Sequence, residues 1–210
     1  NTVIDALKTT VRSDYKFRDD TLNDVFASGG RVILMTAHRR ENLGEPLENI
    51  CSAVRDVVLS HDDVHLVYPM HMNPIVRSTA TSILGGLDRV HLIEPLDVED
   101  MHNDMECCYL VMKDSGGLQE EAPSLGKPVI VLRNETERPE AVEAGTVIMG
   151  GVHKADIVHK ANMLLNDKQV YDKIAHTANP YGDGNASARI ADAILYAFGM
   201  GERPEDLVNS

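Results

Sequence analysis

The feature of the sequence that most constrains the fold is an alternation of short apolar runs with longer segments of helical character. Six apolar runs have the length of a strand, at residues 31–37, 64–69, 89–93, 109–112, 128–132 and 146–149. No hairpin turn sequence joins any two of them. Strands separated by helices form parallel sheets, because a parallel pair requires a crossover connection. The pattern predicts an α/β domain with a Rossmann-like parallel sheet and helices on both faces.

The segments outside these runs have the apolar spacing of helices. The first such stripe runs from Val3 to Val11. Further helices are predicted over residues 46–59, 74–84, 98–107, 118–125, 139–143, 155–166, 168–176 and 186–198. No internal repeat or linker divides the chain, so we expect residues 1–210 to form a single domain. Residues 1–28 would be a helical lead-in and residues 186–199 a terminal helix.

Charge and composition exclude several functional classes. The chain carries a net charge of −13, whereas proteins that contact nucleic-acid backbones need a basic face. No run reaches the roughly eighteen apolar residues of a membrane span, and the first residues lack the basic and apolar regions of a signal peptide. The three cysteines are odd in number and lack CxxC spacing. We therefore expect a cytoplasmic protein that binds neither nucleic acid nor membrane.

The sequence also lacks the common cofactor and metal motifs. No GxGxxG follows a predicted strand, and Gly126-Lys127 has no glycine at the spacing of a P-loop. There is no HExxH, and the nine histidines show no metal-ligand spacing. We therefore expect neither a cofactor nor a metal ion.

Candidate site residues lie in the loops after the strands, where ligands bind in a doubly wound sheet. After the first strand, AHRRENLGEP places His38 and Arg39 at the strand's end. Charge at this position favours an anion site, and an exposed loop with an Arg-Glu pair is the alternative. After the second strand, PMHMNP contains His71, a catalytic or purely structural hydrogen-bonding group, and Asn73, which equally suits the N-cap of the next helix.

The loop after the fourth strand, DSGGLQEEAPSLGKP, carries the strongest signal. Ser115 suits the N-cap of the following helix, while Gly116 and Gly117 allow a ligand to approach backbone amides that the helix dipole makes favourable for anions. Glu120 and Glu121 follow one turn later, where carboxylates can accept hydrogen bonds from ribose hydroxyls. The segment predicts a phosphate cradle beside sugar-binding carboxylates. The alternative is an ordinary capped helix with an acidic first turn.

The loop after the fifth strand contains Glu137-Arg138-Pro139 at the start of a short predicted helix. The Arg138 guanidinium has the geometry to bind a diphosphate with two parallel hydrogen bonds. A surface ion pair with Glu135 or Glu140 is the alternative. Because these loops share one edge of the predicted sheet, together they indicate an anionic small molecule bound at that edge.

Six stretches occur in order along nearly the whole chain: NTVIDAL, TAHRREN, YPMHMNP, DSGGLQEEAPSLGKPV, TERPEAVEAGTV and NPYGDGNASARI. Together they resemble the non-hydrolysing UDP-N-acetylglucosamine 2-epimerases. Members of that family have two Rossmann-like lobes of the GT-B type with the active site between them. The resemblance implies that this chain is the C-terminal lobe, without the N-terminal lobe. It also implies that the last helix is the segment that crosses back to the first lobe.

The resemblance further implies a reaction. UDP-N-acetylglucosamine and UDP-N-acetylmannosamine would be interconverted by elimination of UDP and its re-addition to the other face of the sugar, which supplies cell-envelope polysaccharide precursors. The implied partners are UDP, the UDP-N-acetylhexosamine, the N-terminal lobe and, for the full-length protein, a second copy in a homodimer. Because the family's acid and base carboxylates lie in the first lobe, the isolated chain is expected to be largely inactive.

Roles for individual residues follow from the positions that match the family's motifs. His38 would be a catalytic residue close to the diphosphate. Ser115, Gly116 and Gly117 would bind phosphate, Glu121 the ribose hydroxyls and Arg138 the nucleotide. Arg39 and His71 match an allosteric site for a second substrate molecule in bacterial relatives.

Two positions depart from the family's pattern, and three other functions stay open. Met101 stands where some relatives have an aromatic residue near the uracil, so a thioether contact would replace or weaken base stacking. Lys113 stands where threonine is common and adds a charge near the phosphate loop. A GT-B glycosyltransferase lobe would release UDP only with an acceptor. A non-catalytic UDP-sugar-binding module would bind without chemistry, and a hydrolysing epimerase would release free N-acetylmannosamine.

Overall fold

The computed structural model describes residues 1–206. Its six strands are β1 (Arg31–Thr36), β2 (Val64–Pro69), β3 (Val90–Ile93), β4 (Leu110–Lys113), β5 (Val129–Val131) and β6 (Val147–Met149). They form one parallel sheet in the order β3-β2-β1-β4-β5-β6. The predicted fold class is thus confirmed, and each predicted strand is found within two residues of its expected ends. The order reverses direction between β1 and β4, which is the position where open α/β sheets bind ligands.

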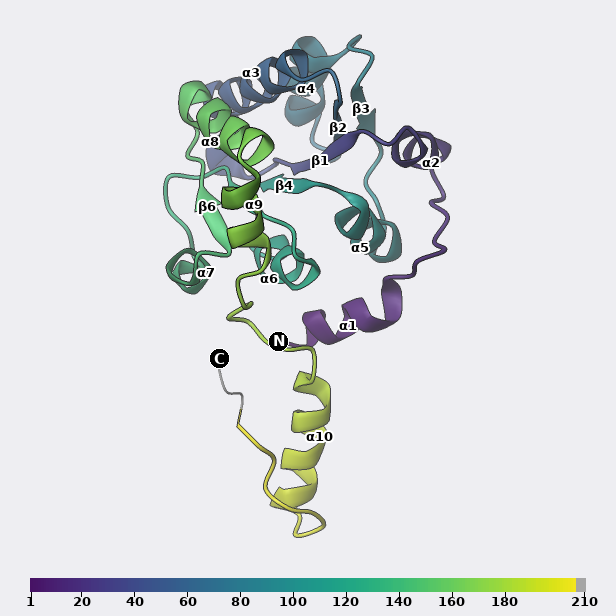
Figure 1. The fold of residues 1–210 in the computed structure, drawn as a ribbon, viewed down its shortest axis with the longest axis vertical. Coiled ribbons are helices and arrows are strands. Elements are labelled where there is room, and N and C mark those ends of the chain that lie inside the picture. Colours follow the sequence, from purple (N-terminus) through teal and green to yellow (C-terminus); the bar gives the residue numbers. More distant parts are fainter. Residues whose placement is uncertain (207–210) are drawn as a thin grey trace.

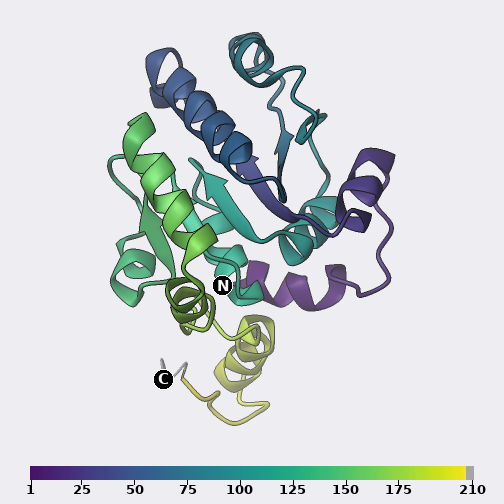
Figure 2. The ribbon, with the colours of Figure 1, turned by 45° about the horizontal axis from the view of Figure 1, so that its top comes forward.

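Helices cover both faces of the sheet (Figures 1 and 2). The longer ones are α1 (Thr2–Thr10), α2 (Asp20–Ala27), α3 (Glu45–Ser60), α4 (Pro74–Leu84), α5 (Val98–Cys107), α8 (Lys154–Asn166), α9 (Lys168–Ala175) and α10 (Ala186–Ala197). The shorter ones are α6 (Leu118–Glu121), α7 (Pro139–Ala144) and the 3₁₀ turns η1 (Arg40–Asn42) and η2 (Ala122–Leu125). No helix within residues 1–206 combines the length and apolarity that crossing a bilayer requires.

Two apolar cores lie on opposite faces of the sheet. On one face, α3, α4 and α8 pack against alternate strand residues such as Ile33, Leu66 and Met112. On the other face, α2, α5, α6, η2 and α7 pack against the intervening residues, such as Leu34 and Val111. Burial on both faces explains why the strands read as continuous apolar runs in the sequence.

The segment after β4 differs from the predicted helix over 118–125. That helix is split into α6 and η2, because Pro123 lacks an amide hydrogen and its ring crowds the carbonyl four residues earlier. The expectation that Ser115 caps the helix is wrong. Helical geometry begins after Gly117, which is the N-cap residue, and no side chain caps this end. The Ser115 carbonyl instead accepts a hydrogen bond from the Gln119 side chain at 3.1 Å.

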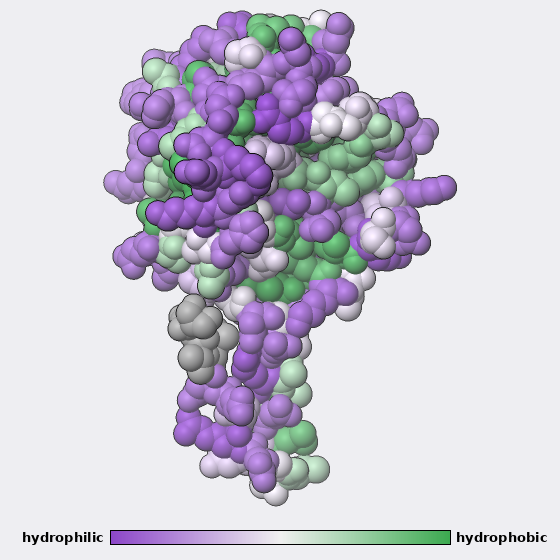
Figure 3. Space-filling view, viewed as in Figure 1, coloured by the Kyte–Doolittle hydropathy of each residue, from purple (hydrophilic) through white to green (hydrophobic). Residues whose placement is uncertain are grey.

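The C-terminal helix α10 projects away from the rest of the lobe, next to the N-terminus (Figure 1). Its first amides, on Ala186 and Ser187, donate to the Asp5 carboxylate at 3.1 and 2.6 Å, so α1 caps α10 across the chain. Beyond this junction the helix is exposed on all sides. Its exposed apolar residues include Ile190, Ile194, Leu195, Tyr196 and Phe198. In Figure 3, a few apolar side chains appear near the lower end of this helix among hydrophilic ones.

Candidate functional site

A cavity of about 330 Å³ lies at the reversal of strand order, beyond the carboxyl ends of β1 and β4. We call it the edge cavity. It is lined by Thr36, His38, Leu96, Asp97, Val98, Met101, His102, Ser115, Gly117, Leu118 and Glu121. Five of the predicted site residues are therefore brought together: His38 from the loop after β1, Met101 from α5, and Ser115, Gly117 and Glu121 from the turn after β4 and α6.

Asp114 joins the two central loops of this cavity. It directly follows β4 and is fully buried. One carboxylate oxygen, Oδ2, accepts hydrogen bonds from the backbone amides of His38 and Arg39, both at 2.8 Å, and from the Asn42 side chain at 3.1 Å. These bonds fix the loop after β1 against the turn after β4, so Asp114 determines where His38 stands relative to Ser115.

His38 is half-buried at the mouth of the edge cavity, with 37% of its side chain exposed. Its ring is stacked on that of His71 from the loop after β2, with ring centroids 5.0 Å apart. Burial lowers the pKa of His38, Asp114 opposes this shift, and the positive charges of His71, Lys113 and Arg39 add to it. A neutral imidazole is thus favoured near neutral pH, in the form that can accept a proton.

The turn formed by Ser115, Gly116 and Gly117 leaves its backbone open to a ligand. Neither glycine has a positive φ, so the backbone conformation does not require glycine here. A Cβ atom added at Gly116 would meet no atom within 4 Å, and one at Gly117 would only just reach the Glu121 carboxylate. The missing side chains keep the amides accessible. Because α6 is a single turn, its dipole contributes less than a long helix would.

Glu121 and Met101 form the inner part of the edge cavity. Burial raises the pKa of Glu121, while the Lys113 ammonium partly offsets the shift. Nε2 of His102, on α5, lies 3.9 Å from its carboxylate. The other ring nitrogen of His102 is 2.7 Å from the Thr10 hydroxyl, which ties α1 to this wall. Met101 is partly buried beside them and packs against the second core.

Arg138 points to a neighbouring carboxylate and does not line the edge cavity. Its Nε donates to Oε1 of Glu120 at 2.6 Å, so the predicted alternatives, ion pairs with Glu135 or Glu140, are replaced by a partner that the sequence reading did not consider. The Asn1 side chain also donates to Glu120. Glu120 is therefore already engaged, which leaves Glu121 as the carboxylate available to a ligand.

Arg39 lies in a group of ion pairs just outside the edge cavity. Its guanidinium is 3.3 Å from Glu137 and 3.6 Å from Glu41, and Arg133 pairs with the same two carboxylates at 3.4 and 3.2 Å. The predicted Arg-Glu pairing of this loop is thus present, through partners in two loops. Across residues 1–206, no cluster of three or more His, Cys, Asp or Glu side chains could hold a metal ion.

Comparison with known proteins identifies the family. The sequence profile of the UDP-N-acetylglucosamine 2-epimerases matches residues 1–195. The chain belongs to this family. A relative from Thermotoga maritima is 55% identical across 98% of this chain, and the UDP-N-acetylglucosamine 2-epimerase of Bacillus subtilis is 51% identical across 98%. Those matches cover 54% and 53% of the relatives themselves, so the chain spans about half the length of the curated relatives it matches and corresponds to their C-terminal lobe.

Solved structures of other family members superpose closely. A Staphylococcus aureus protein solved with UDP has a TM-score of 0.92 and 50% identity over 99% of this chain and 56% of its own. A UDP-N-acetylglucosamine 2-epimerase from Neisseria meningitidis, bound to UDP-N-acetylglucosamine, has a TM-score of 0.82 and 41% identity over 93% of this chain and 54% of its own. The C-terminal domain of a Francisella tularensis glycosyltransferase, 16% identical with a TM-score of 0.61, shares the fold alone.

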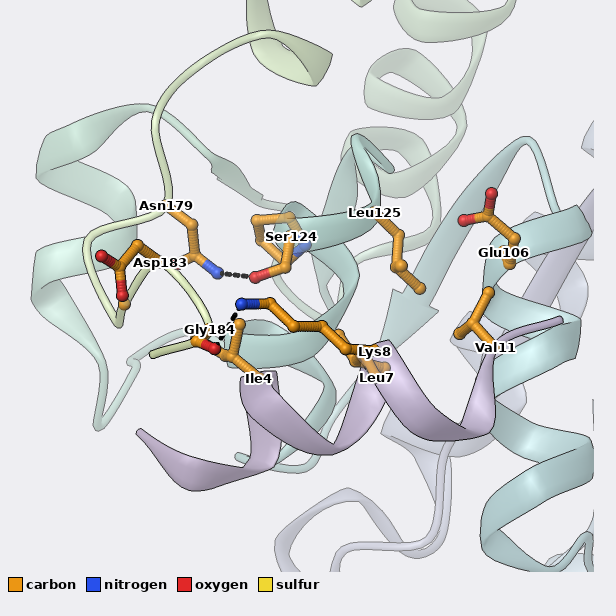
Figure 4. A pocket seen from close by; sticks show the side chains of 12 residues that line it. Ile4, Leu7, Lys8, Val11, Glu106, Ser124, Leu125, Asn179, Asp183 and Gly184 are labelled. Atoms are coloured by element: carbon orange, nitrogen blue, oxygen red, sulfur yellow. Dashed lines mark hydrogen bonds between the residues drawn. The ribbon is translucent and has the colours of Figure 1, made fainter. Parts of the chain in front are cut away.

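A second cavity, of about 470 Å³, is the larger one and lies elsewhere on this lobe (Figure 4). We call it the α1 cavity, because α1 forms one wall and η2 and residues 179–184 form others. Lys8 reaches across it to the Gly184 carbonyl, and Asn179 donates to Ser124. Its lining residues do not follow the carboxyl end of any strand. Size alone would therefore select a cavity without the groups expected for nucleotide binding.

The sequence reading missed several residues of the edge cavity. His102, which lines it, was not singled out, nor were Asp114 and Asn42, which hold its loops in place. Asp114 directly follows an apolar run and precedes two glycines, which is the signal that could have identified it. Gly116 and Arg138 are not among the residues that line the cavity. Asn73 caps α4, because its side chain accepts a hydrogen bond from the Ile75 amide at 3.0 Å. The prediction that Asn73 is the N-cap of this helix is thus confirmed.

Proposed function

We propose that this chain is the UDP-binding half of an enzyme that interconverts UDP-N-acetylglucosamine and UDP-N-acetylmannosamine. The observation that carries the proposal is the convergence of His38, Ser115 and Glu121 on one cavity at the reversal of strand order, in a chain of the epimerase family. The UDP complex of the Staphylococcus aureus relative and the UDP-N-acetylglucosamine complex of the Neisseria meningitidis relative support the choice of ligand.

The diphosphate would bind at the turn of Ser115, Gly116 and Gly117. The open space above Gly116 gives phosphate oxygens access to backbone amides and to the Ser115 hydroxyl. His38 stands across the cavity, held through its amide by Asp114, and would face the diphosphate as a catalytic residue. A neutral His38 can accept a proton, whereas a protonated one would stabilise the charge of departing UDP.

The nucleoside would occupy the inner part of the edge cavity. Glu121 would accept hydrogen bonds from the two ribose hydroxyls, because Glu120 is already engaged by Arg138. Met101 would contact the uracil ring through its thioether. Arg138 would exchange its partner Glu120 for the nucleotide, which is a small rearrangement because its side chain is exposed.

The reaction would proceed by elimination of UDP and its re-addition to the other face of the sugar. Removal of the C2 proton requires a base within hydrogen-bond reach of the sugar. By family resemblance that base lies in the N-terminal lobe, and α10 would be the segment that returns to it, since its exposed apolar residues need a covering surface. We therefore propose that residues 1–210 alone bind UDP but turn over little.

Three further parts of the proposal concern the whole protein. Arg39, which follows His38 in the chain, and His71, which is stacked on the His38 ring, do not line the edge cavity and would contribute to an allosteric site for a second UDP-N-acetylglucosamine. The full-length protein would form a homodimer. It would act in the cytoplasm, where Cys51, Cys107 and Cys108 would stay reduced as the free thiols seen here, and would supply cell-envelope polysaccharide precursors.

Proton NMR of UDP-N-acetylglucosamine in D₂O with this chain tests the proposal. We expect broadened uracil resonances, an unchanged C2 proton and no mannosamine anomeric signal. Glu121→Ala should abolish the broadening, whereas Glu106→Ala, a carboxylate of the α1 cavity, should preserve it. Loss of the C2 proton with a growing mannosamine signal would show that these residues hold the whole active site. Sharp uracil lines with the unmodified chain would refute UDP binding.

A further inference from the structure

Lys113 is a buried lysine in the middle of the sheet, at the carboxyl ends of the strands, and the proposed function gives it no role. It is the last residue of β4 and pairs with Thr36, the last residue of β1, so it lies at the reversal of strand order, directly before the turn of residues 114–117. Its side chain is fully buried, and its ammonium nitrogen has no hydrogen-bond partner among residues 1–206. Burial of an unpartnered ammonium group is costly, because the group loses its hydration and no hydrogen bond replaces it. Such a position needs a functional explanation.

Charged groups surround Lys113 from three elements. The carboxylates of Glu120 and Glu121 face it from α6, and Asp114 adjoins it in the turn. Arg39 and His38, in the loop after β1, are also close enough to interact with its charge. Burial dominates and lowers the pKa of Lys113 to about 7, although the three carboxylates favour its charged form. None of them comes within 4.0 Å of the ammonium nitrogen in the described structure, so its charge is not matched by a contact ion pair.

The influence of Lys113 reaches the edge cavity. Its positive charge lowers the pKa of both His38 and Glu121, and both side chains line that cavity. An anion bound between His38 and Glu121 would in turn favour the charged form of Lys113, because electrostatic interactions between two groups are reciprocal.

We propose that Lys113 supplies positive charge to the nucleotide site and takes up a proton from the solvent when a diphosphate binds. The inference rests on the proposed function, since it places the diphosphate at the turn of Ser115, Gly116 and Gly117. The negative charges of the diphosphate would add to those of the surrounding carboxylates and favour the charged ammonium. Lys113 thus acts as a positioning residue beneath the phosphates, and the affinity for UDP becomes dependent on pH.

The sign of this dependence follows from linkage. A ligand that raises the pKa of a group binds more tightly when the group is protonated, so affinity is highest below the pKa of the free protein and falls as pH rises through the pKa of the complex. With a free value of about 7 and a rise of about one unit on binding, UDP affinity should fall about fivefold between pH 7 and pH 9. The same shift corresponds to an uptake of about 0.4 proton per UDP at pH 8.

Isothermal titration calorimetry of the 210-residue chain with UDP, at pH 8 in two buffers of different ionisation enthalpy, measures this uptake. At pH 8 the terminal phosphate is already ionised, since its second pKa is about 6, and so contributes little. We expect proton uptake with the unmodified chain and none with Lys113→Met, whose unbranched side chain is one atom shorter and carries no charge. Lys113→Met should fold at least as well, because it removes a buried unpartnered charge.

The two histidines that line the edge cavity, His38 and His102, could also take up a proton, and both have lowered pKa values. His38→Gln tests the one that would face the diphosphate. Because the pKa of His38 is lowered from 6.5, this variant should retain most of the uptake at pH 8. UDP binding without proton uptake, or uptake that persists in Lys113→Met, would overturn the role of Lys113 and leave the proposed function intact. Absence of UDP binding at every pH would overturn both. If Lys113→Met failed to fold, uptake by His38→Gln and the fivefold pH dependence of the unmodified chain would still decide the question.

Discussion

The edge cavity and the α1 cavity differ in how their walls are built. The edge cavity is the smaller, and its polar groups converge from loops that follow β1, β3 and β4. The α1 cavity lies between the first helix and a late segment, and its polar groups mostly bond one another across the opening, as Lys8 does with Gly184 (Figure 4). In the edge cavity, the loops are held through their backbone amides, so side chains stay free to contact a ligand. In the second, side chains are used to hold two segments of the chain together.

The largest expected difference between the two cavities is in how much one aspartate at each of them contributes to the stability of the fold. Asp114→Ala should lower the free energy of unfolding by about 3 kcal/mol, because the amides of His38 and Arg39 lose a buried acceptor. Asp183→Ala, beside the α1 cavity, should change stability little, because Asp183 pairs with Arg189 at an exposed position. Urea denaturation of both variants measures this. Equal losses for the two would mean that Asp114 does not hold the edge cavity together.

The next largest expected difference is in the stability cost of replacing one glycine at each cavity by alanine. Gly184 has φ +77°, and an added Cβ would lie 2.5 Å from the Lys8 side chain, so Gly184→Ala should cost about 2 kcal/mol. Gly116 has ordinary φ and open space around it, so Gly116→Ala should leave stability unchanged within about 1 kcal/mol. The same methyl group would cover the phosphate position and should weaken UDP binding roughly tenfold, a change of about 1.4 kcal/mol. Thermal unfolding and calorimetry of each variant separate the two effects. Unchanged UDP affinity in Gly116→Ala would place the phosphates elsewhere.

Sequence patterns were sufficient for the fold because its strands are buried on both faces. Each strand is a continuous apolar run, and the intervening helices have regular apolar stripes, so both signals are local. The helix α2 was not predicted separately, since eight residues capped by Asp19 give too short a stripe to stand out. The break at Pro123 was visible in the sequence but was overlooked.

Candidate site residues could be predicted where position in the fold identifies them. His38, Ser115 and Glu121 follow strand ends, and parallel topology brings such positions to one edge. Their partners could not be predicted, because pairing between distant loops leaves no local pattern. Asp114 bonds amides more than seventy residues away, and Arg138 chooses Glu120 over two nearer glutamates because the turn after β4 brings Glu120 alongside it.

The smallest expected difference between the cavities is their response to pH, because two histidines, His38 and His102, line the edge cavity and none lines the α1 cavity. Burial lowers the pKa of His38 below its ordinary 6.5, so the unfolded chain binds the proton more readily. The resulting stability is present above pH 6.5 and is lost as pH falls through the folded-state pKa. More than a third of the side chain is exposed, so solvent screening should limit the loss to a few tenths of a kcal/mol.

An NMR titration of the His38 ring, compared with urea denaturation of His38→Gln between pH 5 and pH 7.5, measures this effect. The ring should titrate with a midpoint below 6.5, and the variant should lose less stability on acidification than the unmodified chain. His65, His91 and His102 have lowered pKa values as well, so only the difference between the two proteins reports on His38. A midpoint above 6.5 would mean that attraction to Asp114 outweighs burial. His38 would then be cationic at the diphosphate before any substrate arrives, and its role would shift from accepting a proton to binding the anion.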